Sequence, residues 1–150
     1  MGVISGSGAI TKSGSGTLTL SGSNSFTGSV NITAGTLSAA HNNSLGSTPN
    51  LISSSGTFKT TSGVVLPSLT TSGAINLSSG IVTTGAQNYT GNVVVAAGTT
   101  ASPVEYTTTN SDITFAGTLK GEGNAKARSI TINAGTGDIL FGDRVGYAFN

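Results

Sequence analysis

Hydrophobic residues alternate with polar residues in short runs along most of the chain. In Thr17–Leu20 two leucines alternate with two threonines, and farther on Val30 and Ile32 flank Asn31. A period of two is the signature of a β-strand that buries one face and exposes the other. Glycine-rich turns separate the runs, so that none exceeds the usual strand length of about six residues. The pattern therefore predicts an all-β protein built from many short strands.

The same alternation sets the predicted strand positions along the whole chain. Pro67 ends one of the runs, because a proline cannot donate a hydrogen bond to a sheet ladder. The predicted strands lie at residues 3–4, 9–11, 17–20, 30–33, 36–39, 50–52, 57–60, 64–66, 74–77, 81–83, 92–96, 104–107, 113–115, 117–120, 129–132 and 138–141.

An internal repeat indicates how these strands are arranged. Residues 22–36 align without gaps on residues 85–99, and residues 130–136 form a third, shorter copy. The landmarks of the longer alignment pair Gly22 with Gly85, Phe26 with Tyr89, Gly28 with Gly91 and Gly35 with Gly98. Coils of about 20–25 residues suit a β-solenoid, so the offset between the two longer copies predicts about three coils.

We therefore predict a parallel β-solenoid with three short strands per coil and about six to seven coils. Each strand would pair with the equivalent strand of the next coil, aliphatic side chains would point inward, and glycines would occupy corners that need a positive φ. A β-sandwich is the competing fold, because short strands separated by turns also predict one. The repeat offsets favour the solenoid.

Composition and charge narrow the function. Charged residues are only 7% of the chain and the formal net charge is +1, so the high net charge typical of disorder is missing. The six Lys and Arg form no basic stripe, so we expect no nucleic-acid partner. The longest apolar run, residues 93–97, is too short to cross a bilayer. The absence of cysteine excludes disulfides and thiolate metal sites.

We interpret Met1 as a start residue added to an excised fragment. Residues 1–150 are then one solenoid segment of a longer protein, whose signal peptide would lie upstream.

Three stretches carry a family resemblance. Residues 14–40, GSGTLTLSGSNSFTGSVNITAGTLSAA, followed by Ser44-Leu45-Gly46, resemble the passenger-associated transport repeat of bacterial autotransporters. Residues 2–13 are similar to the segment that commonly leads into that repeat, and residues 113–145 resemble the strand repeats of bacterial surface proteins of the filamentous-haemagglutinin type. Residues 50–84 match in composition only.

The resemblance implies a right-handed parallel β-helix that is exported through the outer membrane by the parent protein's translocator and is displayed on, or shed from, the bacterial surface. The implied function is a non-enzymatic stem of a surface adhesin that supports export, display and adhesion. A glycan or a host or matrix surface is the expected partner, and no cofactor is expected.

Few side chains suggest chemistry. His41 is the only histidine and has no Ser–His–Asp arrangement around it, so we interpret it as a loop residue. Asp138 and Asp143, near Arg128 and Arg144, form the only local cluster of both signs. Carboxylates act as acid and base in polysaccharide-cleaving enzymes, but these two would sit on either side of a corner and need not converge. A surface ion pair is the favoured interpretation. The single Gly-Asp string at residues 135–138 predicts no metal site.

The aligned aromatic residues Phe26 and Tyr89 have two interpretations. Stacking in the core is favoured, because aromatic side chains dominate buried area. The alternative is an exposed stripe that stacks on sugars, so Phe26, Tyr89, Asp138 and Asp143 are the candidate surface-binding residues. Two other functions stay open: a filament or biofilm-matrix subunit that self-associates end to end through open strand edges, and a carbohydrate-active β-helix enzyme.

Overall fold

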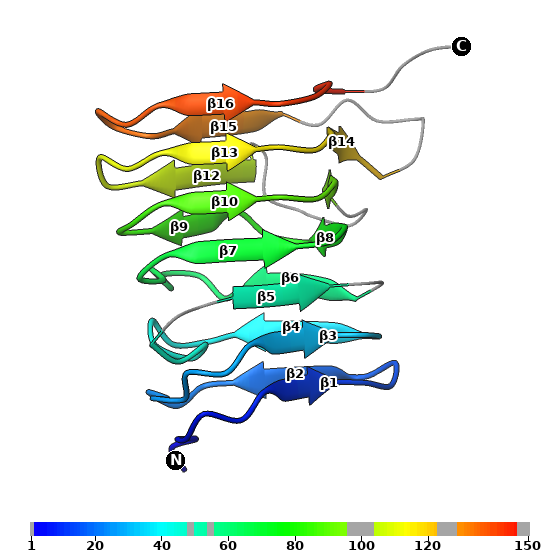
Figure 1. The fold of residues 1–150 in the computed structure, drawn as a ribbon, viewed down its shortest axis with the longest axis vertical. Coiled ribbons are helices and arrows are strands. Elements are labelled where there is room, and N and C mark those ends of the chain that lie inside the picture. The colour runs from blue at the N-terminus through cyan, green and yellow to red at the C-terminus, as the bar shows by residue number, and fades with distance from the viewer. Residues whose placement is uncertain (1, 48–49, 54–55, 96–103, 123–128, 147–150) are drawn as a thin grey trace.

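The chain winds into a stack of parallel β-strands. The computed structural model describes residues 2–47, 50–53, 56–95, 104–122 and 129–146, and contains strands and turns but no helix within them. Every strand pair in these residues is parallel, and the strands follow one another along a single axis from β1 to β16 (Figure 1). The prediction of an all-β protein with parallel strands is confirmed.

Three sheets run along the axis. The seven-stranded sheet contains, in spatial order, β1 (Ile10–Lys12), β3 (Val30–Ile32), β5 (Asn50–Ser53), β7 (Leu69–Ser72), β10 (Gln87–Tyr89), β13 (Ile113–Phe115) and β16 (Ile139–Phe141). The six-stranded sheet contains β2 (Thr17–Leu20), β4 (Thr36–Ala39), β6 (Thr57–Thr60), β8 (Ile75–Leu77), β11 (Val93–Val95) and β14 (Leu119–Gly121). The three-stranded sheet contains β9 (Ile81–Thr83), β12 (Val104–Thr108) and β15 (Ile130–Asn133).

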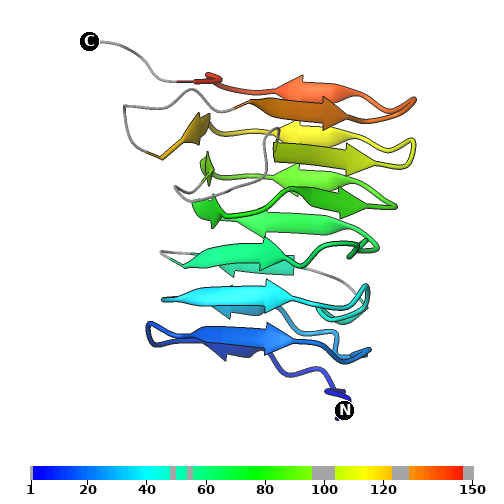
Figure 2. The ribbon, with the colours of Figure 1, turned by 180° about the vertical axis from the view of Figure 1, so that it is seen from behind.

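The third sheet begins only halfway along the chain. From β1 to β6 the described strands alternate between the two larger sheets, and β9 is the first strand of the third. Seen from behind, the blue and cyan strands of the six-stranded sheet face the viewer at one end, and the strands of the three-stranded sheet do so at the other (Figure 2). The predicted three strands per coil therefore does not describe the N-terminal windings.

The length of a winding varies along the axis. In the seven-stranded sheet Val30 pairs with Leu51, Leu51 with Thr71, Thr71 with Tyr89 and Tyr89 with Phe115. Of these steps, the one from Thr71 to Tyr89 is the shortest and the one from Tyr89 to Phe115 is the longest. Three windings from Val30 thus lead to Tyr89, whereas the sequence repeat aligns Val30 with Val93.

The sequence repeat is consequently not the structural repeat. Its three copies place Val30 in the seven-stranded sheet, Val93 in the six-stranded sheet and Ile130 in the three-stranded sheet. A short strand followed by a small-residue turn fits any of the three faces, so similarity between two such units does not fix their register. The landmark Gly98 lies outside the described residues.

Two predicted strands are absent, and two observed strands are not predicted. Residues 3–4 form no strand, and in 64–66 only Leu66 forms an isolated bridge, with Thr83. Strands β7 and β10 escape prediction because they carry polar residues at inward positions, where Thr71 and Gln87 are fully buried. Hydrophobic alternation cannot detect a strand whose inner face is partly polar.

The core consists of columns of inward side chains, one side chain per winding. In the six-stranded sheet, adjacent strands place Leu37 beside Phe58, Phe58 beside Leu77 and Leu77 beside Val95, and all four are fully buried. Burying a side chain of this size contributes about 1.5–3 kcal/mol. Each winding therefore depends on its neighbours for most of its stability.

Glycines serve two different purposes at the turns. Gly35 has a φ of +68°, as predicted for a corner. Gly28 is required by close approach, because a Cβ there would overlap the carbonyl oxygen of Gly8 in the adjacent winding. Gly91 stands in the same relation to Gly73. The predicted need for a positive φ thus holds at Gly35 but not at Gly28 or Gly91.

Candidate functional site

A column of stacked aromatic rings runs through the C-terminal windings. Tyr89 stacks on Phe115 with ring centroids 4.8 Å apart and planes 8° apart, and Phe115 stacks on Phe141 at 5.5 Å and 10°. Tyr106, from the three-stranded sheet, meets the rings of Tyr89 and Phe115 edge-on. Strands that are distant in sequence are therefore held together by ring contacts as well as by aliphatic packing.

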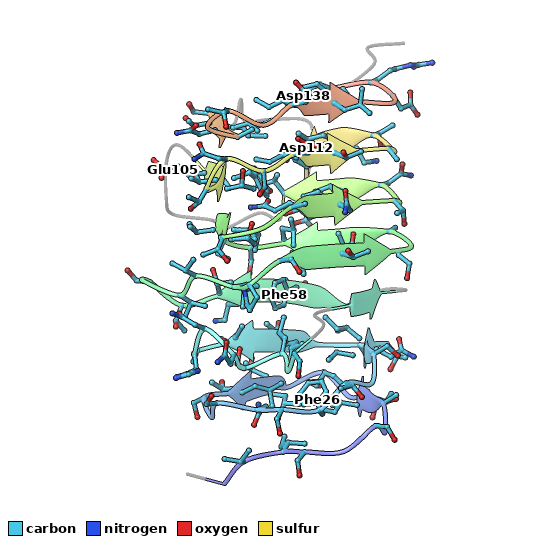
Figure 3. All side chains as sticks on the ribbon, turned by 60° about the vertical axis from the view of Figure 1, so that its left-hand side comes forward. Phe26, Phe58, Glu105, Asp112 and Asp138 are labelled. Atoms are coloured by element: carbon cyan, nitrogen blue, oxygen red, sulfur yellow. The ribbon has the colours of Figure 1, made fainter. Side chains whose placement is uncertain are left out.

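The two aromatic candidates do not form a surface stripe. Phe26 is 1% exposed and Tyr89 is 0% exposed. Phe26 lies in the core of the N-terminal windings, before β3 (Figure 3), whereas Tyr89 lies in β10. Because neither ring reaches the surface, the prediction that they bind a sugar there is wrong, and the favoured interpretation as core residues fits their positions.

A buried glutamine links three elements beside the aromatic column. The Nε2 of Gln87 donates hydrogen bonds to the carbonyl oxygens of Ile81 at 3.0 Å and Thr107 at 2.9 Å, and its Oε1 accepts one from the hydroxyl of Tyr89 at 2.8 Å. The hydroxyl of Tyr106 is buried and has no hydrogen-bond partner among the described residues. Sequence reasoning does not find this network; its only signal is the pair of polar residues in Gln87–Tyr89.

Both core tyrosines are neutral at physiological pH. Burial, and then the neighbouring Tyr106, raise the pKa of Tyr89 well above its usual value, and burial raises the pKa of Tyr106. A phenol held this way cannot exchange protons readily with solvent. We therefore interpret the aromatic and glutamine cluster as structural.

The candidate carboxylates lie at opposite ends of one strand. Asp138 precedes β16, Asp143 follows it, and both are exposed. The carboxylate of Asp143 accepts a hydrogen bond from the backbone N–H of Arg144 at 2.7 Å, and Arg128 lies outside the described residues. The extended strand β16 lies between the two aspartates and separates their side chains along the chain.

Acidic and amide side chains instead connect consecutive windings. Asp112 Oδ1 accepts a hydrogen bond from the backbone N–H of Asp138 at 2.9 Å, and these two residues lie one above the other (Figure 3). The side chains of Asn92 and Asn110 accept in the same way from the N–H groups of Thr118 and Thr136, at 3.0 and 3.1 Å. In each case the acceptor precedes its donor by one full winding.

Neither a metal-ligand cluster nor a membrane-spanning helix is found among the described residues. They contain no group of three or more His, Asp or Glu that could hold a metal ion. They also include no helix that is long and apolar enough to cross a membrane. His41 is exposed and its Nδ1 accepts a hydrogen bond from the backbone N–H of Asn43 at 3.1 Å, in keeping with a loop residue.

Large exposed hydrophobic side chains gather at the two ends of the stack. Val3 and Ile4 lie before β1, at the N-terminal end. At the C-terminal end Ile139, Leu140, Phe141 and Val145 are 43%, 58%, 40% and 57% exposed. The large exposed hydrophobic side chains of the described residues thus mark the first and the last described windings.

Comparison with known proteins finds a family match in the N-terminal windings. Residues 10–39, which span β1 to β4, match the family model described as passenger-associated-transport-repeat. The resemblance of residues 14–40 to the autotransporter passenger repeat is thereby confirmed. No curated protein and no solved structure matches the chain. The match indicates an autotransporter passenger-type segment.

Proposed function

We propose that this chain is a stem segment of a secreted bacterial surface adhesin of the autotransporter type. The observation that carries the proposal is the match of residues 10–39 to the passenger repeat, together with the parallel pairing that continues from those strands to β16. Two of the three sheets continue without a break from the repeat into the rest of the described chain. A continuous architecture suits a part that separates a cell surface from a distal binding region.

The proposal includes finer features of the winding. We propose a right-handed helix of about six to seven coils, a number supported by the seven strands of the largest sheet. Outside the cell, each new winding would form on the edge of the preceding one. The free energy released by burying columns such as Leu37, Phe58 and Leu77 would oppose slippage of the chain back through the outer-membrane translocator.

The outer faces provide polar contacts for adhesion. In the seven-stranded sheet, adjacent strands place Thr70 beside Asn88 and Asn88 beside Thr114, on the face that points away from the core. Hydroxyl and amide groups at this spacing can donate and accept hydrogen bonds with a glycan or a matrix protein. The proposed role is non-enzymatic, because the exposed aspartates Asp138 and Asp143 lie at opposite ends of β16.

The test is surface display of the chain fused to an autotransporter translocator in a Gram-negative host. Leu37→Asp puts a carboxylate into the core and is expected to cost about 4 kcal/mol or more. It should sharply reduce the amount of an N-terminal epitope that antibodies detect on intact cells, relative to total protein. The matched control is Thr19→Asp, which adds the same group at an exposed position of β2 and should leave display unchanged. Equal display of both variants would contradict the stem proposal.

A further inference from the structure

Lys12 carries the only charged side chain that is buried among the described residues, and it is 6% exposed. It ends β1 at a position that pairs with Ile32, whose side chain is fully buried in the core. The stem of Lys12 therefore lies in a core column. The first acidic residue of the chain is Glu105, in β12, which lies far along the stack from β1 (Figure 1). The charge of Lys12 is thus buried without a carboxylate beside it.

Backbone carbonyl groups take the place of a counter-ion. Lys12 Nζ donates hydrogen bonds to the carbonyl oxygens of Ser13 and Gly14, at 2.9 and 2.7 Å. It donates a third to the carbonyl oxygen of Ala34, at 3.1 Å, so each of the three N–H donors of the ammonium group has an acceptor. Ser13 and Gly14 lie in the turn between β1 and β2, and Ala34 lies in the turn between β3 and β4. Two consecutive windings thus build one carbonyl cage from these three oxygens.

A glycine makes room for the ammonium group. A Cβ at Gly35 would stand 2.7 Å from Lys12 Nζ and would overlap the carbonyl oxygen of Gly14. One winding on, Gly56 occupies the equivalent corner, and a Cβ there would overlap the side chain of Ile32. An aliphatic side chain therefore fills this kind of corner as well as a lysine does. What the charge of Lys12 adds is the set of hydrogen bonds.

We propose that the carbonyl cage is a binding site for a primary ammonium ion, which the side chain of Lys12 fills in the native chain. Converging carbonyl dipoles can replace the hydration shell of a monovalent cation. Three acceptors match the three N–H donors of a primary ammonium ion, which favours it over a cation without donors. By filling the site, Lys12 ties the turns of two windings together. This site does not depend on the proposed stem function.

The first test shortens the side chain and supplies the missing part from solution. Lys12→Ala removes the atoms of one n-propylammonium ion, so n-propylammonium chloride is the probe. We expect the variant to unfold at a lower urea concentration than the parent, and the probe to raise its midpoint toward that of the parent. The backbone amide signals of Gly14 and Gly35 should shift saturably in the same titration. The parent should show neither effect, because its own ammonium group fills the cage.

Two controls separate the site from general effects of salt and charge. Tetramethylammonium chloride supplies a monovalent cation without an N–H donor, so it should neither raise the midpoint of Lys12→Ala nor shift those amide signals. Lys59→Ala makes the same substitution in β6, on the outer face beside Ser38. This variant should unfold at the midpoint of the parent and should not respond to n-propylammonium.

Lys12→Met keeps the proposal testable if an empty cage prevents folding. Methionine retains an unbranched stem of similar length and should fill the corner, as Ile32 does one winding on. It has no donor for the three oxygens, so the midpoint should fall below that of the parent. n-Propylammonium should not restore it, because the methionine side chain occupies the cage.

A measurement on the unaltered chain completes the test. Ammonium protons of exposed lysines exchange with water too fast to give a nitrogen–proton signal in NMR at neutral pH. Those of Lys12 should give such a signal, because the group is buried and all three donors are hydrogen-bonded.

Three results would overturn the proposal. The first is the absence of the Lys12 ammonium signal in the parent chain. The second is an equal response of Lys12→Ala to n-propylammonium and tetramethylammonium, which would indicate a general effect of salt. The third is a Lys12→Met midpoint equal to that of the parent, which would mean that the stem of Lys12 stabilises the corner and its charge does not.

Discussion

At the scale of single residues, the buried polar side chains of the core differ in whether their polar atoms have hydrogen-bond partners. Gln87 uses its amide to join β10 to the carbonyl oxygens of Ile81 and Thr107, and it accepts from Tyr89. The hydroxyl of Tyr106 lies beside the same rings without a hydrogen-bond partner among the described residues. The hydroxyl of Tyr89 therefore stabilises the fold through its hydrogen bond, whereas the hydroxyl of Tyr106 costs free energy because it is buried without one.

The first prediction compares these two hydroxyls. Tyr89→Phe removes the donor to Gln87 Oε1 and should lower the free energy of unfolding by about 1–2 kcal/mol. Tyr106→Phe removes a buried hydroxyl that carries a desolvation cost, so it should leave stability unchanged or raise it by about 1 kcal/mol. Urea unfolding followed by circular dichroism measures both. Equal destabilisation by the two variants would mean that Tyr106 has a partner in solution.

At the scale of secondary-structure elements, some turns of adjacent windings approach so closely that their backbones are in contact. Gly28, just before β3, faces the carbonyl oxygen of Gly8, so that no side-chain atom can stand between them. Gly16, just before β2, has no heavy atom within 4 Å of where its Cβ would stand. The same residue type thus has a strict steric role at one turn and none at the other.

The second prediction uses this contrast. Gly28→Ala forces two windings apart and should destabilise the protein by about 2 kcal/mol or more. Gly16→Ala should be neutral or stabilise by up to about 1 kcal/mol, because it restricts the unfolded chain without a clash. The shift of the urea midpoint at constant slope measures the difference. A Gly16→Ala variant as unstable as Gly28→Ala would contradict the assigned contact.

Sequence periodicity locates most strands, and it fails where the inner face is polar. It predicts Thr17–Leu20, Thr36–Ala39, Thr57–Thr60 and Ile81–Thr83 with their observed bounds. It misses β7 and β10 because Thr71 and Gln87 stand where an aliphatic residue is expected. Hydrophobic alternation predicts that a strand is present, but it does not predict which sheet the strand joins. Residues 30, 93 and 130 are therefore equivalent in the sequence repeat although they lie in three different sheets.

The candidate surface-binding residues fall into two groups, the exposed aspartates and the buried aromatic residues, and the sequence predicts the two groups unequally well. The spacing of Asp138 and Asp143 gives only that they need not converge, and the structure adds that the strand β16 lies between them. The exposure of Phe26 and Tyr89 depends on which face each residue takes, and a repeat alignment does not determine that.

At the scale of the whole molecule, each strand of the seven-stranded sheet pairs, within the described residues, only with its counterparts in adjacent windings. Thr71 pairs with Tyr89 in the following winding and with Leu51 in the preceding one. Stability in such a stack is approximately a sum of terms for single windings and for adjacent pairs. Removal of one complete winding should consequently preserve the interfaces that the remaining windings make.

The third prediction tests this modularity. Deleting residues 72–89 removes one register repeat and joins Thr71 to Thr90, so that Phe58 can pair with Val95 in place of Leu77. The shortened chain should fold, with the β-type circular dichroism signal per residue of the parent. Deleting residues 72–80 removes half of that repeat and shifts every later strand out of register, so this control should unfold or aggregate. Similar behaviour of the two deletions would contradict the register.

The strand order also decides how the segment would respond to tension. β1 and β16 lie at opposite ends of the stack, so a pull between them acts along the direction in which the ladder hydrogen bonds point (Figure 1). Under such a load the bonds of one strand break in turn instead of all together, and windings peel off singly. Even the short winding from Thr71 to Tyr89 would release on the order of 60 Å of extended chain. Under load the segment would thus lengthen in steps and dissipate mechanical energy, while the windings still in place keep their fold.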